Sequence, residues 1–213
     1  MGIEILNIDC MEYMATQPDN AFDLAIVDPP YGIGIDGQKE DIKGKKSYRK
    51  YHKIKGWDTN IPPKIYFREL ERISTNQIIF GGNYFVNHLI EGHKGWIIWD
   101  KGQHGLTMSD CEIAYSNFDT PTRIWTQNRC ILKSEGTIHP TQKPIKLYEW
   151  LLTNYAEPGQ RILDTHLGSG SSAIAAHYFG VDFVGCELDK DYFEAAKNRF
   201  DQQTTQSAMF AEQ

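Results

Sequence analysis

The final third of the chain carries the pattern that most restricts its fold. A short apolar run at residues 161–164 leads through a glycine and serine loop into a helical pattern at 173–180. A second strand pattern follows at 181–189, and a second helical pattern at 190–200. Parallel strands need a crossover, usually a helix, to bring the chain back to the starting edge. Residues 161–200 therefore predict one βαβα unit.

The rest of the 213 residues continues this alternation. Strand patterns occur at 3–9, 22–28, 77–82, 95–101 and 111–117, and helical patterns at 10–20, 62–73, 84–90 and 139–160. Residues 118–137 show no regular period and are predicted to be irregular. The alternation predicts a single α/β domain with an open, doubly wound, mostly parallel sheet of Rossmann-like type.

Basic residues gather in one segment of an acidic chain. The net charge is −6, yet Asp36 to Lys64 holds nine basic and four acidic residues. Residues 36–57 lack periodicity and predict a long loop, a length that is typical of functional lids or binding loops. The candidate phosphate contacts are Lys43, Lys45, Lys46, Arg49, Lys50, Lys53 and, further along, Arg123. Tyr48, Tyr51 and Trp57 are interleaved with them, and a solvated run of charge is the alternative.

Several classes of protein are disfavoured by the sequence. Its apolar runs are too short to span a membrane, and its N-terminus lacks the pattern of a secretory signal. We therefore expect a cytoplasmic protein. The four cysteines Cys10, Cys111, Cys130 and Cys186 show no C-x-x-C spacing, so neither a zinc site nor a disulfide framework is expected.

A glycine-bearing loop stands where a strand pattern turns into a helix. Residues 164–171 read DTHLGSGS, and Gly168 and Gly170 let the backbone approach a ligand beside free helix amides. Glu187 ends the next strand pattern, where an acid can accept hydrogen bonds from two ribose hydroxyls. The loop lacks both G-x-G-x-x-G and a Walker lysine, so a nucleoside with a non-phosphate tail is favoured over a nucleotide.

A second motif, Asp28-Pro29-Pro30-Tyr31, ends the strand pattern at 22–28. Open α/β sheets bind their ligands at such strand ends. The Asp28 carboxylate and the Pro29 carbonyl can accept both hydrogens of an aryl amine and turn its lone pair toward an electrophile. Tyr31 can stack on a base. A simple turn at the strand end is the alternative.

Three motifs in a fixed order resemble the amino-methylating DNA methyltransferases. They are D-P-P-Y at 28–31, H-P-T-Q-K-P at 139–144 and DTHLGSGS at 164–171. Their order is similar to that of the circularly permuted β class. Asp rather than Ser before Pro-Pro-Tyr resembles the adenine branch more than the N4-cytosine branch. The resemblance implies S-adenosylmethionine as cofactor, DNA as partner, and methyl transfer to N6 of a flipped adenine by a single catalytic domain over residues 1–213.

The resemblance also implies roles for individual residues. Residues 28–31, that is Asp28, Pro29, Pro30 and Tyr31, would form the catalytic motif. Glu187 would bind the cofactor's ribose, Asp9 its adenine, and Lys143 would face its carboxylate end. The full implied set of cofactor residues is Asp9, His139, Thr141, Gln142, Lys143, Asp164, His166, Gly168, Ser169, Gly170, Ser171 and Glu187.

Two features depart from the family pattern. Thr165 and His166 replace a Pro-Phe pair, so His166 either takes the place of the aromatic ring against the cofactor or is a partly exposed loop histidine. The segment at about 116–138, in the usual position for target recognition, is short. Recognition is therefore either relaxed or shared with the basic loop.

Other functions stay open at this point. The alternatives are an N4-cytosine methyltransferase, an RNA or protein-glutamine amide methyltransferase, and a catalytically silent DNA-binding module on the same scaffold. The sequence also leaves open a homodimer, a partner restriction endonuclease and the recognition sequence.

Overall fold

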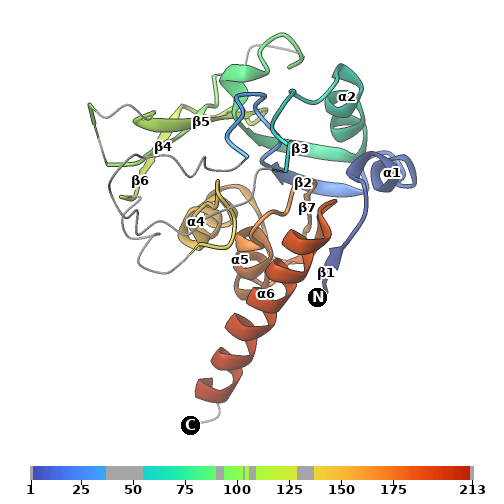
Figure 1. Cartoon of the computed structure of the whole chain (residues 1–213), viewed down its shortest axis with the longest axis vertical. Helices are drawn as coiled ribbons and strands as arrows, with labels where there is room; N and C mark the ends of the chain where they lie inside the picture. Colours follow the sequence, from blue (N-terminus) through green and yellow to red (C-terminus); the bar gives the residue numbers. More distant parts are fainter. Residues whose placement is uncertain are drawn as a thin grey trace.

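The computed structural model describes residues 2–36, 55–89, 94–102, 104–105, 109–128 and 137–211, with side chains to residue 205. Within these ranges one sheet has the strand order β1-β8-β7-β2-β3-β5-β4-β6 (Figure 1). Its strands are β1 (Ile3–Leu6), β2 (Phe22–Val27), β3 (Ser74–Phe80), β4 (Ile97–Asp100), β5 (Cys111–Ser116), β6 (Arg123–Thr126), β7 (Arg161–Asp164) and β8 (Asp182–Cys186).

The strand directions confirm the expected fold class. β1, β8, β7, β2 and β3 are parallel to their neighbours in that order. β5 runs antiparallel to both β3 and β4, and β6 is parallel to β4. The sheet is therefore mixed but mostly parallel, and the reversal at β5 is confined to the half that carries β4, β5 and β6.

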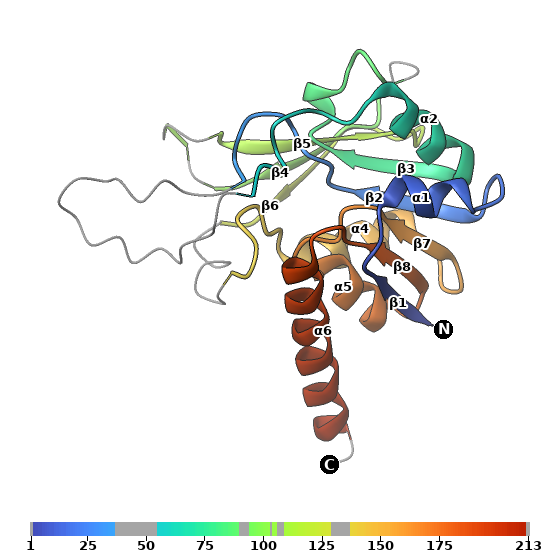
Figure 2. The same cartoon turned by 45° about the vertical axis from the view of Figure 1, so that its right-hand side comes forward.

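Helices cover both faces of the sheet (Figures 1 and 2). They are α1 (Cys10–Ala15), α2 (Lys64–Ile73), α4 (Ile145–Tyr155), α5 (Ser171–Phe179) and α6 (Lys190–Ala211), and a 3-10 turn, η1, spans Gly82–Tyr84. α1 and α2 lie on one face and α4 and α5 on the other, while the far end of α6 projects away from the sheet (Figure 2). Among the described helices, none combines the length and apolar character needed to cross a membrane.

The central strand β2 shows why both faces are covered. Side chains along a strand alternate between its two faces. Leu24 and Ile26 belong to the core cluster formed with α4 and α5, whereas Ala25 and Val27 belong to the cluster formed with α1 and α2. A strand that is buried on both faces needs a continuous apolar run, which is what residues 24–27 provide.

Three sequence-based expectations need correction. The helix expected at 84–90 is wrong over its described part, where only η1 forms, because so short a segment gains too few helical hydrogen bonds. Residues 118–137 are not wholly irregular, since β6 pairs with β4. β6 is a mostly exposed edge strand of four residues, so it lacks an apolar signal. Finally, α6 continues past residue 200 to Ala211.

Strand register brings the two key motifs together. β2 and β7 pair in parallel, with Leu24 opposite Ile162 and Ala25 opposite Leu163. The chain therefore leaves β2 at Asp28 beside the point where it leaves β7 for the glycine-bearing loop. β8 and β1 extend the same edge, because Leu6 pairs with Cys186.

Asp164 ends β7 and braces the loop that follows. It is only 1% exposed. Its Oδ1 accepts a hydrogen bond from the His166 amide at 3.0 Å, and its Oδ2 accepts one from the Ser172 hydroxyl at 2.6 Å. Burial raises the pKa of Asp164 to about 7, even though these two hydrogen bonds oppose the shift.

Asp164→Asn should therefore gain stability relative to the wild type as pH rises. The unfolded chain loses the Asp164 proton near its ordinary pKa of 3.8, whereas the folded chain retains it to about 7. The wild-type free energy of unfolding thus falls by about 1.4 kcal/mol per pH unit within this window, a cost that asparagine avoids. Urea unfolding of both proteins from pH 5 to 8.5 should show a difference that grows up to pH 7 and then levels off.

The same substitution at the exposed Asp119 serves as a control and should show no such trend. A difference between Asp164→Asn and the wild type that stays constant across this range would contradict the prediction.

Candidate functional site

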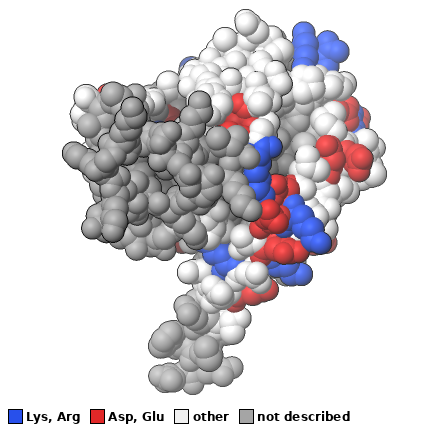
Figure 3. All heavy atoms as spheres, viewed as in Figure 1, with Lys and Arg blue, Asp and Glu red and all other residues white. Residues whose placement is uncertain are grey.

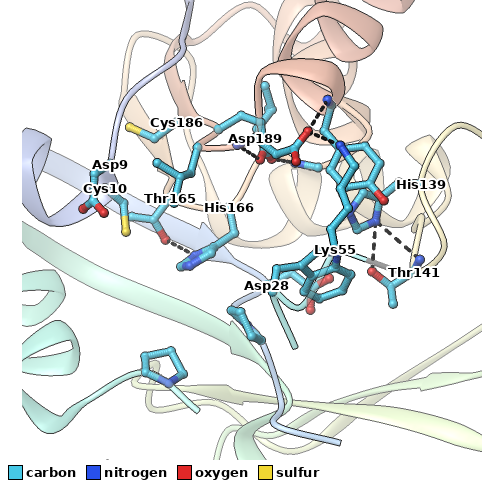
Figure 4. Close-up of a pocket in the computed structure, with 18 of the residues that line it drawn as sticks. Asp9, Cys10, Asp28, Lys55, His139, Thr141, Thr165, His166, Cys186 and Asp189 are labelled. Carbon is cyan, nitrogen blue, oxygen red and sulfur yellow. Dashed lines mark hydrogen bonds and ion pairs between the residues drawn. The ribbon is translucent and has the colours of Figure 1, made fainter. Parts of the chain in front are cut away.

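A cavity of about 740 Å³ lies at the carboxyl ends of β1, β2, β7 and β8. Asp9, Asp28, Gly168 and Glu187 line it, each from the segment after a different strand. Figure 4 shows Asp9, Asp28 and His166 around this cavity, with Lys55, His139 and Thr141 toward its other end. Its volume lies within the range of roughly 300–1,000 Å³ that is typical of small-molecule and cofactor sites.

The glycine-bearing loop forms one wall of this cavity. Gly168 has a φ of +54°, a left-handed conformation that glycine adopts without strain. Its amide donates a hydrogen bond to Glu187 Oε2 at 2.8 Å, and the Asp189 amide donates to Glu187 Oε1 at 2.9 Å. Burial raises the pKa of Glu187, although these two backbone hydrogen bonds oppose the shift. The loop thus fixes an acidic side chain at the cavity wall.

His166 lines the same cavity, as expected if it replaces the family's aromatic residue. Its ring meets the edge of the Tyr66 ring with 5.4 Å between centroids. Its Nδ1 lies 2.9 Å from the Thr165 hydroxyl oxygen. Burial lowers the pKa of His166 to about 4, so at neutral pH the ring is an uncharged aromatic surface.

The opposite wall contains residues that the sequence did not point to as part of this cavity. Lys55 makes ion pairs with Asp189 at 2.5 Å and Asp191 at 2.8 Å. Trp57 packs against His139 with 5.3 Å between ring centroids, and both line the cavity. Trp57 was instead expected among the aromatic residues interleaved with the DNA contacts. The acidic run after Glu187 was the available signal for a lysine partner.

Two buried aspartates hold the described chain on either side of residues 37–54. The Asp58 carboxylate accepts hydrogen bonds from the Gly32 and Ile35 amides, both at 2.8 Å. Asp36 accepts hydrogen bonds from the amides of Lys55 and Gly56. These bonds join the segment after D-P-P-Y to the wall that contains Trp57.

The D-P-P-Y motif lies between this cavity and a second one of about 400 Å³, which all four of its residues line. The Tyr31 hydroxyl donates to Asp28 Oδ1 at 2.6 Å. The Tyr31 ring stacks on Tyr84 with 5.0 Å between centroids, so one of its faces is already in contact within the chain. Gly81 has a φ of +74°, and a Cβ there would collide with the Tyr31 ring.

Lys143 contacts the motif from the other side. Its Nζ donates to Asp28 Oδ2 and lies 3.1 Å from Glu112 Oε2, while Lys101 Nζ lies 3.0 Å from Glu112 Oε1. Burial alone would lower the pKa of Lys143, but Asp28 and Glu112 outweigh burial and raise it. Burial opposes ionisation of Glu112 as well, yet Lys143 and Lys101 lower its pKa to about 2. Four groups of alternating charge thus lie in a row.

This geometry gives Lys143 partners that the sequence did not indicate. The resemblance implied that Lys143 faces the cofactor's carboxylate. The structure shows the ammonium between two carboxylates of the chain itself. Glu112 and Lys101 carried no sequence signal, because their importance arises only from the pairing of β5 with β4 and from the approach of Lys143.

Most of the implied cofactor residues come together. Those that line the larger cavity are Asp9, His139, Thr141, Gln142, Lys143, His166, Gly168, Ser169 and Glu187. Asp164, Gly170 and Ser171 do not line this cavity. Asp164 and Ser171 are buried and brace the loop with hydrogen bonds, and Gly170 precedes α5.

Of the expected DNA contacts, only Arg123 belongs to the described residues. Lys43, Lys45, Lys46, Arg49, Lys50 and Lys53 lie outside the described residues. Arg123 is exposed on β6 and lines neither cavity. In the view of Figure 3, acidic and basic side chains of the described residues are interspersed, so the described part of this face shows no separate basic patch.

Known proteins resemble this chain over nearly its whole length. A family model described as DNA methylase, covering N6 and N4 enzymes, matches residues 93–198. Type II methyltransferase M.HinfI of Haemophilus influenzae is 24% identical, with 92% of this chain and 67% of that protein aligned. Type II methyltransferase M.HpaI of Haemophilus parainfluenzae is 25% identical, with 86% of this chain and 69% of that protein aligned.

Solved structures share the fold. The M1.HpyAVI–SAM complex superposes with a TM-score of 0.59 at 21% identity, covering 93% of this chain and 100% of that one. The cytosine-N4-specific PvuII DNA methyltransferase gives a TM-score of 0.60 at 13% identity, covering 95% of this chain and 92% of that one. These structures show a shared fold, and the family match over residues 93–198 shows that this part of the chain is similar to the N6/N4 DNA methylases.

Proposed function

We propose that this chain transfers the methyl group of S-adenosylmethionine to the N6 amino group of adenine in DNA. The observation that carries the proposal is the pairing of β2 with β7, which puts Asp28 and the glycine-bearing loop at one edge of the sheet. Asp28 belongs to both cavities, so a group in one can meet a group in the other beside its carboxylate. The family match supports DNA as the substrate.

The larger cavity suits S-adenosylmethionine. Its wall offers the Glu187 carboxylate for the ribose hydroxyls and the uncharged His166 ring as an apolar surface. Asp9 also lines the cavity, although its Oδ1 accepts a hydrogen bond from the Met11 amide at 2.7 Å and caps α1. When bound, the cofactor supplies an electrophilic methyl group. The residues that would hold it are Asp9, His139, Thr141, Gln142, His166, Gly168, Ser169 and Glu187.

The smaller cavity suits a base turned out of the DNA helix, which is how enzymes reach an atom inside a duplex. Pro29 and Pro30 stiffen the backbone beside Asp28. The Asp28 carboxylate and the Pro29 carbonyl would accept the two amino hydrogens and draw the nitrogen out of conjugation. Positioning of this kind, rather than covalent attack by the chain, would supply most of the rate enhancement.

The choice of adenine rests on the sequence of the motif. Asp precedes Pro-Pro-Tyr here, as in the adenine branch that the sequence resembles. N4-cytosine methylation is the second candidate, because the cytosine-N4-specific PvuII enzyme shares the fold over most of both chains. We also propose that the basic segment at 36–57 and Arg123 contact DNA phosphates, and that residues 1–213 act as one catalytic domain.

Asp28→Ala should lower methyl transfer to DNA by at least about 100-fold, because it removes the acceptor that orients the amine. The purified protein would be incubated with DNA and labelled S-adenosylmethionine. Digestion of the product to nucleosides and mass spectrometry should then yield N6-methyladenine from the wild type. Detection of N4-methylcytosine in place of N6-methyladenine would favour the second candidate. The absence of any methylated nucleoside would overturn both the adenine and the cytosine proposals. Asp119→Ala, at an exposed position, serves as the control and should behave like the wild type.

Glu187→Gln should weaken cofactor binding by about tenfold or more, since hydrogen bonds to a charged group contribute roughly 1.5–3 kcal/mol each. Isothermal titration calorimetry with S-adenosylmethionine measures this directly and needs no DNA. Glu194→Gln, at an exposed position of α6, is the matched control. Wild-type affinity in Glu187→Gln would exclude the ribose contact.

A further inference from the structure

Lys143 joins the two motifs that the proposed reaction requires. Its backbone carbonyl accepts a hydrogen bond at 2.8 Å from the hydroxyl of Ser171, the first residue of α5 after the glycine-bearing loop. Its side chain reaches the other way and donates to Asp28. One residue thus ties the cofactor loop to the catalytic carboxylate, and only 3% of it is exposed.

The surroundings of Lys143 hold its ammonium in one place. The Nζ lies 4.6 Å from the centre of the Phe80 ring, a distance at which the ring attracts a cation. Glu112 Oε2 lies 3.1 Å from the Nζ and is a second anionic partner in addition to Asp28. Lys101 in turn pairs with the other oxygen of Glu112. Lysine side chains are almost never fully buried unless they are paired, and here two carboxylates provide the pairing.

Asp28 needs a cation close to it in order to stay ionised. Burial raises its pKa, Lys143 opposes that rise, and the nearby Glu112 carboxylate adds to it. The titratable groups that act on Asp28 or feel its charge are Lys143 of the H-P-T-Q-K-P segment, Tyr31, Glu112 of β5, Tyr66 of α2, Tyr148 of α4 and Asp164 of β7. Of these six groups, Lys143 alone is cationic.

The ionisation state decides what Asp28 offers to an amine. A carboxylate is an acceptor only, whereas a carboxylic acid carries a proton on one oxygen. A protonated Asp28 would point a donor at a group that is itself a donor. The Tyr31 hydroxyl already donates to Oδ1 and the Lys143 ammonium to Oδ2, so a proton on Asp28 would occupy an acceptor position that the substrate needs.

We propose that Lys143 is a positioning residue, which keeps the Asp28 carboxylate ionised and correctly oriented, and that Glu112 and Lys101 hold Lys143 in place. The proposal deepens the proposed function and rests on it for its catalytic consequence. Its claim about Asp28 itself concerns only side chains of this chain, so it can be tested without cofactor or DNA.

The first experiment follows the Asp28 carboxyl carbon by ¹³C NMR during a pH titration of the full chain. The resonance is assigned by its absence in Asp28→Asn. In Lys143→Met the pKa of Asp28 should rise by about one to three pH units relative to the wild type, the usual effect of losing a close opposite charge. Lys197→Met, at an exposed position of α6, is the matched control and should leave the Asp28 titration unchanged.

The second experiment measures methyl transfer to DNA between pH 5.5 and 9. Lys143→Met should lose activity mainly at low pH, about tenfold for each unit by which the pKa of Asp28 rises, and recover at high pH. Lys143→Arg keeps the charge and should retain the wild-type shape of the pH profile. A purely structural role for Lys143 would instead lower the rate by the same factor at every pH.

Glu112→Gln keeps the proposal testable should Lys143→Met fail to fold. The glutamine amide oxygen can still accept a hydrogen bond from the Lys143 ammonium, so Lys143 stays in place. Because the Glu112 charge raises the pKa of Asp28, its loss should move both the NMR titration and the acidic limb of the activity profile to lower pH. An unchanged Asp28 titration in Lys143→Met or, where that variant does not fold, in Glu112→Gln would overturn the proposal. A wild type that transfers no methyl group would refute the proposed function instead, while the NMR result would still decide the role of Lys143.

Discussion

The parallel pairing of β2 with β7 is the contact on which the rest of the site depends. Residues 24–27 of β2 are apolar and buried on both faces, so this strand lies in the middle of the sheet. The register then fixes where the strand stops, and so places Asp28 next to the loop after Asp164. The larger cavity lies at that edge, where the segments after β1, β2, β7 and β8 begin.

A row of charges that is largely shielded from water is a costly way to hold a side chain. Removing ions from water carries a penalty that their mutual attraction often fails to recover, so such networks are seldom explained by stability alone. Here the row ends at the carboxylate that the proposed chemistry needs. Its retention is better understood as a device for setting the charge and direction of Asp28 than as a contribution to folding.

Much of the fold could be predicted from local patterns, and the reasons for the failures are physical. The ends of the central strands could be predicted because central parallel strands are continuous apolar runs. The glycine-bearing loop could be predicted because its backbone conformation requires glycine at particular positions. β6 was missed because an exposed edge strand of four residues has no apolar pattern. Glu112 and Lys101 were missed because their function comes from contacts across β4 and β5, far from either motif in sequence. Lys143 was predicted as a site residue, but its ion-pair partners Asp28 and Glu112 could not be inferred from the residues next to it in sequence.

The wall that contains Lys55 and Trp57 has a thermodynamic consequence. This short stretch belongs at once to the cofactor cavity, through Trp57 and His139, and to the end of the basic segment that is proposed to contact DNA. If the cofactor or DNA favours one conformation of this stretch, its binding changes the affinity of the protein for the other ligand. Thermodynamic linkage makes this effect equal in both directions. A cofactor that increases the affinity for DNA therefore binds more tightly to the DNA-bound protein, by the same factor.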